Sequence, residues 1–345
     1  MASGQYFSRR RALQLMGGVA GGLLLHACNN QSGNNGSGSN SGTTSISLAG
    51  PIWIGLTPMF IAREKGFFAE KNLVVDFLGF DTNADYMAAF LADQVNAAAP
   101  VTSEAVSLAA QDKNFRIVLV EDLSVGGDGI LADNKIASVE DFKGKQIAVE
   151  KGTVSYFFLL QVLQDFGLSE SDITLLNADP SAAAAAYQAN NVDIAVTYAP
   201  YLGQANEARS NGRIIYDSSQ KPTAITDVYV FDTEFIENNP QAVQGFVDGI
   251  FQGIEFLENN PDEGLEIAAQ KLQITPDALA ADLKGIELPK AQKNLEILSN
   301  RESNIYLGKS LNTLAQLVAE QGEVQNIPDM EQFLEPRFVE AVVNG

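Results

Sequence analysis

The sequence predicts an α/β protein in which two α/β blocks form two lobes around a ligand cleft. Short apolar segments alternate with helical segments from residue 46 onward, the same rhythm restarts near residue 138, and the chain after residue 232 is almost wholly helical. Alternating strands and helices are typical of parallel sheets covered by helices. Such sheets bind ligands at the carboxyl ends of their strands, and a cleft between two of them can close by hinge bending.

The first block is expected to begin with a strand followed by a short helix. Thr57-Pro58 supplies a helix N-cap with proline at the first helical position, and Gly66 supplies the matching stop. The remaining elements follow from apolar runs separated by helical stretches. Strands are expected at residues 46–49, 73–78, 96–99 and 117–121, and further helices at residues 84–92 and 103–110.

The second block repeats this pattern with its own start and stop signals. Ser138 caps a short helix, Gly152-Thr153 precedes a longer helix at residues 154–165, and Gly167 ends it. The alanine run at residues 182–186 is a strong helix former. Strands are expected at residues 146–149, 173–176, 194–196, 214–216 and 227–231, with another helix at residues 200–210.

The helical C-terminal part of the chain contains one short sequence that occurs twice. The tetrapeptide Glu-Asn-Asn-Pro occurs at residues 237–240 and again at residues 258–261. Each copy is expected to start a helix at its proline. Two copies do not make a repeat protein, since solenoids need at least three stacked units.

The N-terminal segment reads as an export signal that ends at a lipidation site. Residues 8–11 read Ser-Arg-Arg-Arg and form a basic region, residues 12–25 are an apolar, glycine-rich run with one Gln, and Ala27 stands directly before Cys28. The apolar run is too short to span a bilayer as a mature helix and has the layout of a signal peptide over residues 1–27. A small residue followed by cysteine resembles the lipobox of bacterial lipoproteins, which implies cleavage before Cys28 and anchoring to the membrane through a lipid on that residue.

Two further expectations concern export and the segment after the signal. Residues 8–13 resemble a twin-arginine motif, and an ordinary Sec signal fits the same residues, so both export routes remain open. Residues 29–45 contain only Asn, Gln, Ser, Gly and Thr. Such a segment has no apolar surface to bury, and residues 28–45 are therefore expected to be a disordered tether.

The composition excludes several classes of function. The chain of 345 residues has one Cys and one His, too few for an intrachain disulfide or a Cys/His zinc site, and no metal or cofactor is expected. If the signal is removed, His26 leaves with it, which also removes histidine-dependent nucleophilic catalysis. The net charge of −21 argues against nucleic acid as a partner, because phosphate binding needs clustered Lys and Arg.

Several motifs, in order along the chain, resemble one family of transport proteins. They are residues 53–68 with Ala62-Arg63-Glu64-Lys65-Gly66-Phe67-Phe68, residues 143–149, 151–153 and 191–200, and the two Glu-Asn-Asn-Pro segments. Together they resemble the nitrate/sulfonate/taurine class of solute-binding proteins of ABC importers, a class that also includes binders of thiamine-pyrimidine precursors.

The resemblance implies a type II periplasmic-binding-protein fold with two hinge crossings. Lobe 1 would comprise residues 46–128 and 229–345, and lobe 2 residues 129–228. A monomer is expected that delivers a small solute to an ABC permease and ATPase on the periplasmic side of a bacterial membrane. One relative, the yeast-type pyrimidine synthase of thiamine biosynthesis, is an enzyme that depends on His and Cys. That activity is not expected here, because the mature chain would lack His and a free thiol.

The candidate ligand-binding residues lie after strand ends and at helix starts, and they are mostly acidic or aromatic. Carboxylates beside aromatic faces suit a planar cation, through charged hydrogen bonds and cation–π stacking. The hypothesis is guanidinium or a similar small nitrogenous cation, with Trp53, Tyr156 or Tyr198 stacking on it. The candidates are Trp53, Asp81, Thr102, Glu104, Asp122, Ser124, Asp128, Thr153, Tyr156, Tyr198 and Asp227.

A second resemblance supports this hypothesis, and alternatives remain beside it. Residues 122–128 read Asp-Leu-Ser-Val-Gly-Gly-Asp and resemble a segment of binders associated with urea/guanidine carboxylase clusters, with Val125 in place of the usual Asn. Helix starts at residues 57–58, 102–103 and 152–153 instead allow a sulfonate, nitrate or bicarbonate held by backbone amides, although nearby carboxylates would repel it. A pyrimidine precursor, a carboxylate-based extracellular enzyme and a sensor subunit also remain open.

Overall fold

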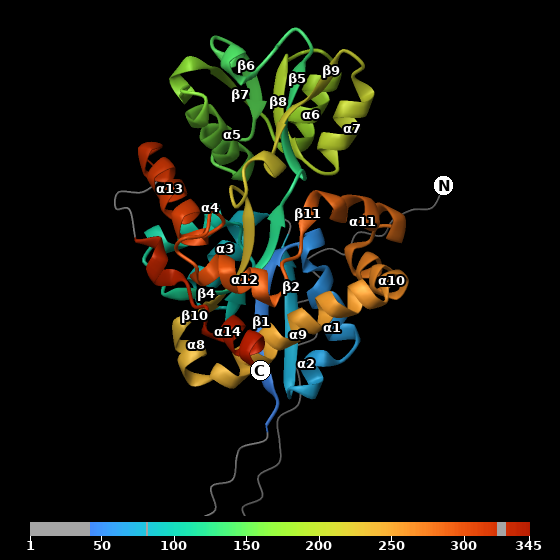
Figure 1. Cartoon of the computed structure of the whole chain (residues 1–345), viewed down its shortest axis with the longest axis vertical. Coiled ribbons are helices and arrows are strands. Elements are labelled where there is room, and N and C mark those ends of the chain that lie inside the picture. The colour runs from blue at the N-terminus through green and yellow to red at the C-terminus, as the bar shows by residue number, and fades with distance from the viewer. Residues whose placement is uncertain (1–41, 81, 323–328) are drawn as a thin grey trace, which may run out of the picture. The chain divides into compact units, whose positions relative to one another are not determined.

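The computed structural model describes residues 42–80, 82–322 and 329–345, whose strands form two sheets flanked by helices (Figure 1). The α/β class expected from the sequence is confirmed. The expected signal peptide, the lipidation site Cys28, residues 28–41 of the expected tether and the candidate Asp81 lie outside the described residues. The end of the tether at residue 45 was wrong, because strand β1 begins at Thr44 and pairs there with Leu73. None of the helices in the described ranges combines the length and hydropathy that a bilayer crossing requires.

The first sheet contains six strands in the order β11-β4-β10-β3-β1-β2. β1 runs parallel to β2 and β3, whereas β10 runs antiparallel to β3 and β4. The sheet is mixed rather than wholly parallel. The chain leaves the sheet at the end of β4 and returns to it at the same edge at the start of β10, so these two strands run in opposite directions. The strands are β1 (Thr44–Pro51), β2 (Leu73–Phe80), β3 (Ala97–Ala98), β4 (Phe115–Ser124), β10 (Thr226–Asp232) and β11 (Ile286–Glu287).

The second sheet contains five strands in the order β7-β6-β8-β5-β9, and it too is mixed. β6 is parallel to β7 and β8, but β5 is antiparallel to β8 and β9. β5 was not expected, since Asp128-Gly129 has the composition of a turn. The strands are β5 (Asp128–Asp133), β6 (Gln146–Val149), β7 (Thr174–Asn177), β8 (Ile194–Tyr198) and β9 (Gly212–Asp217).

Helices cover both faces of the second sheet because its strands alternate two apolar faces. Leu131 and Ala148 pack with α6 (Pro180–Gln188) and α7 (Tyr201–Ala208), while Ile130 and Ile147 face the other side and join the cluster that contains Phe157 and Phe158 of α5 (Val154–Asp165). Figure 1 shows α5 on one side of this sheet and α6 and α7 on the other.

The first sheet is packed against helices from both ends of the chain. α1 begins at Thr57 with Pro58 in its first turn, and α9 and α10 begin at Pro240 and Pro261, as the sequence predicts. The helices are α1 (Thr57–Glu64), α2 (Phe67–Glu70), α3 (Asn83–Leu91), α4 (Thr102–Ala110), α8 (Thr233–Asn238), α9 (Pro240–Asn259), α10 (Pro261–Leu272), α11 (Pro276–Asp282), α12 (Ala291–Ser299), α13 (Leu307–Glu320) and α14 (Arg337–Asn344).

Glycines on α9 set the position of the segment after β1. A Cβ at Gly253 would lie 2.2 Å from the carbonyl oxygen of Pro58, and a Cβ at Gly249 would lie 2.5 Å from the Phe68 ring. The start of α1 therefore rests directly on α9. Between β1 and α1 the chain forms the short 3₁₀ helix η2 (Ile54–Leu56), which begins beside the candidate residue Trp53.

Two chain crossings join the sheets, and hydrogen bonds tie them together. Residues 125–127 connect β4 to β5, and residues 218–225 connect β9 to β10. Ser218 Oγ accepts a hydrogen bond of 2.8 Å from the amide of Gly126 and lies 2.7 Å from Ser124 Oγ. A third segment supports the first crossing, because the Gly285 carbonyl accepts hydrogen bonds from the amides of Val125 and Gly127.

Candidate functional site

A pocket of about 180 Å³, here called the acidic pocket, lies where strand ends and helix starts of the two sheets meet. β1 ends at it, α3, α4 and α5 begin at it, β8 ends at it, and β5 and β10 begin at it. This is the position at which α/β sheets bind their ligands. The lining residues are Pro51, Ile52, Trp53, Asn83, Val101, Glu104, Asp128, Val154, Tyr198, Ile225 and Asp227.

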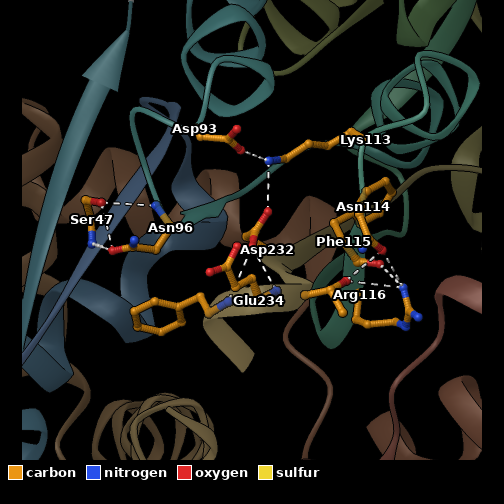
Figure 2. A network of polar contacts seen from close by, with 11 residues as sticks. Ser47, Asp93, Asn96, Lys113, Asn114, Phe115, Arg116, Asp232 and Glu234 are labelled. Carbon is orange, nitrogen blue, oxygen red and sulfur yellow. Dashed lines mark hydrogen bonds and ion pairs between the residues drawn. The ribbon is translucent and has the colours of Figure 1, made fainter. Parts of the chain in front are cut away.

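A larger cavity of about 610 Å³ lies at the opposite ends of β4 and β10, and we do not assign the ligand to it. Figure 2 shows its main feature, the ammonium of Lys113 between the carboxylates of Asp93 and Asp232. The distance from Lys113 Nζ to Asp232 Oδ2 is 2.9 Å. Each of these three charges already has a partner of opposite sign, and the cavity lies away from the carboxyl ends of the parallel strands.

Glu104 projects from the first turn of α4 into the acidic pocket. Its Oε2 accepts a hydrogen bond of 3.1 Å from the amide of Val101 and another from the hydroxyl of Tyr86. The carboxylate thus caps its own helix and occupies an amide that an anionic ligand would need. Burial raises the pKa of Glu104, and the hydrogen bond from Tyr86 opposes that shift.

A β-bulge places two consecutive carboxylates of β4 beside η2. Asp122 pairs with Asp227 across the strands, but Val120 pairs with Val228, so Glu121 is the extra residue of β4. A bulge of this kind re-aims a side chain that regular pleating would send to the other face. A Cβ at Gly55 would lie 2.0 Å from Asp122 Oδ2 and 2.9 Å from Glu121 Oε1, so both carboxyl groups rest against the glycine.

The carboxyl group of Asp122 accepts a hydrogen bond from Trp53 and lies next to a second acidic side chain, Asp227. The indole Nε1 of Trp53 donates a hydrogen bond of 2.8 Å to Asp122 Oδ2. Asp122 Oδ1 is buried and receives no conventional hydrogen bond from the described residues. Its neighbour across the strand pair is the Asp227 carboxyl, and two carboxyl groups hydrogen-bond only when one holds a proton. Burial raises the pKa of Asp122 to about 7.

Asp227 is repelled by the charges of four other acidic side chains. Burial raises its pKa well above the ordinary value, and the charges of Asp122, Glu121, Glu104 and Asp128 each raise it further. Val101 forms an isolated bridge with Asp227, which brings the start of α4 against β10. Glu104, Glu121, Asp122, Asp128 and Asp227 are called the acidic cluster below.

Asp128 links the acidic pocket to the chain crossings. Its Oδ2 accepts a hydrogen bond of 2.7 Å from Ser124, and its amide donates to Ser218 at 3.4 Å. Burial raises the pKa of Asp128 to about 6, and the bond from Ser124 opposes that shift. Ser124 therefore supports Asp128 from the crossing and is not itself a lining residue of the pocket.

Tyr198 forms part of the aromatic wall of the acidic pocket. It is the last residue of β8 and pairs with Asp128 of β5. The Tyr198 ring and the Asp128 carboxylate therefore come from paired positions on neighbouring strands. Its ring centroid lies 6.3 Å from that of Tyr201. Burial raises the pKa of Tyr198 to about 12, with smaller contributions from the charges of Glu150 and Asp128. Its hydroxyl therefore stays protonated and can donate a hydrogen bond.

The structure brings five of the predicted residues to the pocket wall and places the others elsewhere. Trp53, Glu104, Asp128, Tyr198 and Asp227 line it, and Asp122 lies directly behind Trp53. The starts of α4 and α5 reach the wall through Val101, which precedes α4, and Val154, the first residue of α5, with Thr102 and Thr153 next to them in the chain. Tyr156 does not line the pocket.

Tyr156 belongs to α5 and is fully buried, and its hydroxyl contacts residues that do not line the acidic pocket. Its hydroxyl donates to Glu170 at 2.7 Å, and the side-chain oxygen of Gln321 also lies 2.7 Å away. Because α5 begins at Val154, the side chain of Tyr156, two positions later, points into the core. This orientation could not be predicted from the sequence. Packing explains this residue without any contact to ligand.

Several residues of the site were not among the sequence candidates. Glu121 was missed because regular alternation would place it on the face opposite Asp122, and no sequence signal announces the bulge. Asn83, Tyr86 and Tyr229 were missed because polar or aromatic residues inside helices and strands usually serve the core. The Tyr229 hydroxyl is buried, has no partner among the described residues, and has its pKa raised by burial and by Glu121.

The electrostatics of the pocket favour a positively charged ligand. No Lys, Arg or His occurs among its lining residues, and no member of the acidic cluster forms an ion pair within the part of the chain that the structure describes. Buried carboxylates without a cation must hold protons or repel one another. The described residues also contain no group of three His, Cys, Asp or Glu side chains arranged to hold a metal ion.

Comparison with known proteins identifies the family. The model of the NMT1/THI5-like family matches residues 53–264, more than half of the chain, and the chain belongs to this family. The taurine-binding periplasmic protein of Escherichia coli K12 is 26% identical over 294 residues, covering 82% of this chain and 89% of that protein.

Solved structures agree on the fold. The periplasmic aliphatic sulphonate binding protein SsuA from Escherichia coli superposes with a TM-score of 0.70 at 18% identity, covering 86% of this chain and 99% of that one. The chain thus has the periplasmic-binding-protein fold. The desulfurization enzyme DSZB has the same overall fold at a TM-score of 0.63 and 15% identity, covering 87% of this chain and 99% of that one. Fold alone therefore does not separate binding proteins from enzymes.

Proposed function

We propose that this protein is the extracytoplasmic solute-binding component of an ABC importer and that its acidic pocket binds a small planar nitrogenous cation of the guanidinium class. One observation carries the choice of ligand: Glu104, Asp128 and Asp227 line the pocket together with Trp53 and Tyr198, and none of the other described lining residues is cationic. The N–H groups along the edge of a guanidinium can pair with carboxylate oxygens while its face lies on an aromatic ring.

The role as a binding protein is supported by family membership and by the function of the relatives. The taurine-binding relative is named as a periplasmic binding protein, and its alignment covers most of both chains. Delivery to a permease and an ATPase, placement on the periplasmic side of the membrane and a lipid anchor on Cys28 belong to the same proposal. The anchor lies outside the described residues.

The two sheets with their helices are proposed to be the two lobes that close on the ligand. The crossings at residues 125–127 and 218–225 mark the change from one lobe to the other. The limits differ by a few residues from the sequence expectation of 128/129 and 228/229, because β5 begins at Asp128 and β10 already begins at Thr226. A boundary at residue 228 would divide a hydrogen-bonded strand.

A sulfonate is the second candidate ligand, and the names of the relatives favour it. The acidic pocket supports it less well. A sulfonate stays negatively charged between pH 5 and 8, and every ionised carboxylate of the acidic cluster would repel it. The Val101 amide at the start of α4 is already bound by Glu104, which removes one donor that an anion would use.

Calorimetry with the purified protein tests the proposal. Guanidinium chloride at low millimolar concentration, taurine, sodium nitrate and a pyrimidine precursor are titrated in turn, with sodium chloride as the control for ionic strength. Guanidinium is expected to bind with release of heat that the control lacks. Tight binding of taurine or nitrate together with a silent guanidinium titration would reject the cation and leave the second candidate.

A further inference from the structure

A second pocket of about 260 Å³, here called the outer pocket, adjoins the acidic pocket. Ile52, Trp53 and Tyr198 line both, so the two share a wall made of one aliphatic and two aromatic side chains. The outer pocket is completed by the segment after β8 and by the segment between α10 and α11. Its further lining residues are Ile54, Ala199, Pro200, Tyr201, Leu272, Ile274 and Asp282.

The outer pocket has the chemistry of a site for hydrocarbon. Ile52 is 52% exposed and Ile274 is 38% exposed, which leaves two large aliphatic side chains facing solvent at its walls. Leu272 and Pro200 add further apolar surface, and Asp282, which is partly exposed, supplies one carboxylate. A ligand group that covers Ile52 and Ile274 gains the free energy of removing this surface from water.

We propose that the outer pocket accommodates an aliphatic substituent on the guanidinium group, so that the ligand class is an N-alkylguanidinium rather than guanidinium alone. The proposal rests on the proposed function, since the charged head must lie in the acidic pocket. The substituent passes the shared wall at Trp53 and Tyr198 and covers Ile274 on the far side. An amino group at the end of such a chain would meet the carboxylate of Asp282.

The shared wall explains why one ligand would span both pockets. At about 180 Å³ the acidic pocket is small, and its described lining carboxylates, Glu104, Asp128 and Asp227, do not line the outer pocket. The apolar surface begins at Ile52 and Trp53 and continues to Ile274 without an intervening cation. A molecule that is cationic at one end and aliphatic at the other matches this order of surfaces.

Calorimetry with two ligands and two variants tests the inference. Wild-type protein is titrated with guanidinium and with butylguanidinium, and both titrations are repeated on Ile274→Asn and on Leu176→Asn. Leu176 is the matched control because it is also 38% exposed but lies on β7, away from both pockets. Butylguanidinium is expected to bind at least tenfold more tightly than guanidinium, and Ile274→Asn to remove most of that gain without changing guanidinium affinity.

Each contrary result has a distinct meaning. Guanidinium binding with no gain for butylguanidinium overturns the inference and leaves the proposed function intact. Equal weakening of both ligands by Ile274→Asn also overturns it, because it assigns the isoleucine to lobe closure. If neither cation binds wild-type protein, the proposed function fails and the inference fails with it. An unchanged thermal midpoint for both variants shows that the comparison concerns folded protein.

Discussion

Trp53 and Asp122 are 69 residues apart in the chain and are joined by a 2.8 Å hydrogen bond from the indole nitrogen to the carboxylate. The bond orients a partly exposed indole on the wall of the acidic pocket. It also satisfies only one oxygen of a fully buried carboxyl group, which pairs across the strands with Asp227 and whose other oxygen receives no conventional hydrogen bond from the described residues. The orientation of the aromatic face and the charge state of the acidic cluster are therefore linked.

Replacement of Trp53 is expected to separate stacking from hydrogen bonding. Trp53→Phe keeps an aromatic face but leaves Asp122 without its donor, and should weaken guanidinium binding by about tenfold, which corresponds to about 1.4 kcal/mol. Trp53→Ala should weaken it by about a hundredfold, because stacking is lost as well. Calorimetry measures both, with Phe166→Ala as the control at another partly exposed aromatic residue. Unchanged affinity in Trp53→Ala would remove this residue from the site.

Asp128→Asn removes one pocket charge while keeping an oxygen for the bond from Ser124. Guanidinium affinity should fall by about tenfold or more, since a charged hydrogen bond becomes a neutral one. Without ligand, the variant should be at least as stable as wild type at pH 8, because a buried carboxylate is replaced by an amide. Asp112→Asn is the control, since it removes one charge at the distant large cavity. An equal loss of affinity in both variants would point to net charge instead.

Gly55→Ala is expected to disturb the acidic cluster directly. The added Cβ would lie 2.0 Å from Asp122 Oδ2 and 2.8 Å from the Trp53 ring, so the carboxylate or η2 must move. The expected loss in the free energy of unfolding is about 1–3 kcal/mol, together with weaker ligand binding. In Gly203→Ala the new methyl meets nothing within 4 Å and lies inside α7, so that variant should be no less stable than wild type. Urea unfolding of both variants distinguishes crowding at the site from a general effect of alanine.

The ligand-free protein should become less stable as the pH rises from 5 to 8. Burial raises the pKa of Asp128 to about 6 and that of Asp122 to about 7, whereas the unfolded chain releases these protons near pH 4. The folded state therefore binds more protons in this interval, and raising the pH favours unfolding. Asp133, whose pKa is lowered by the amide of Lys135, contributes only at more acidic pH.

A bound cation should reverse this trend by displacing the protons. Guanidinium affinity is expected to rise between pH 5 and 8, and scanning calorimetry with and without millimolar guanidinium chloride checks both statements. A thermal midpoint that rises steadily with pH in the ligand-free protein would contradict the protonated cluster. Asp128→Asn should show a shallower dependence than wild type.

Tyr156→Phe should leave ligand binding unchanged, although Tyr156 was a candidate for stacking on the ligand. The hydroxyl interacts with Glu170 and Gln321, so its loss should cost about 1 kcal/mol of folding stability. Tyr198→Ala is the contrasting variant, because that ring lines the acidic pocket and its removal should weaken guanidinium binding. Equal effects of the two variants on affinity would contradict this assignment.

Local signals were enough to predict most elements and the general position of the site. Proline and the residues before it determine where α9 and α10 begin, and Gly66, with φ of 80°, follows the end of α1 as expected. These signals act within a single turn of the chain and need no tertiary partner. Ligands of α/β proteins bind at strand ends and helix starts. This rule was enough to predict Trp53 as a lining residue of the pocket and to choose Glu104 and Asp227 among 43 acidic residues.

By itself the sequence determined the α/β class, the helix starts and the acidic and aromatic character of the loops, because each depends on residues adjacent in the chain. Only the tertiary structure decided that β5 and β10 run antiparallel to their neighbours, that a bulge turns Glu121 to the side of Asp122, and that Tyr156 points into the core. Strand pairing and burial are made between residues far apart in sequence, and the pKa of Asp227 is raised only because folding buries this residue and brings the other carboxyl groups of the acidic cluster close to it.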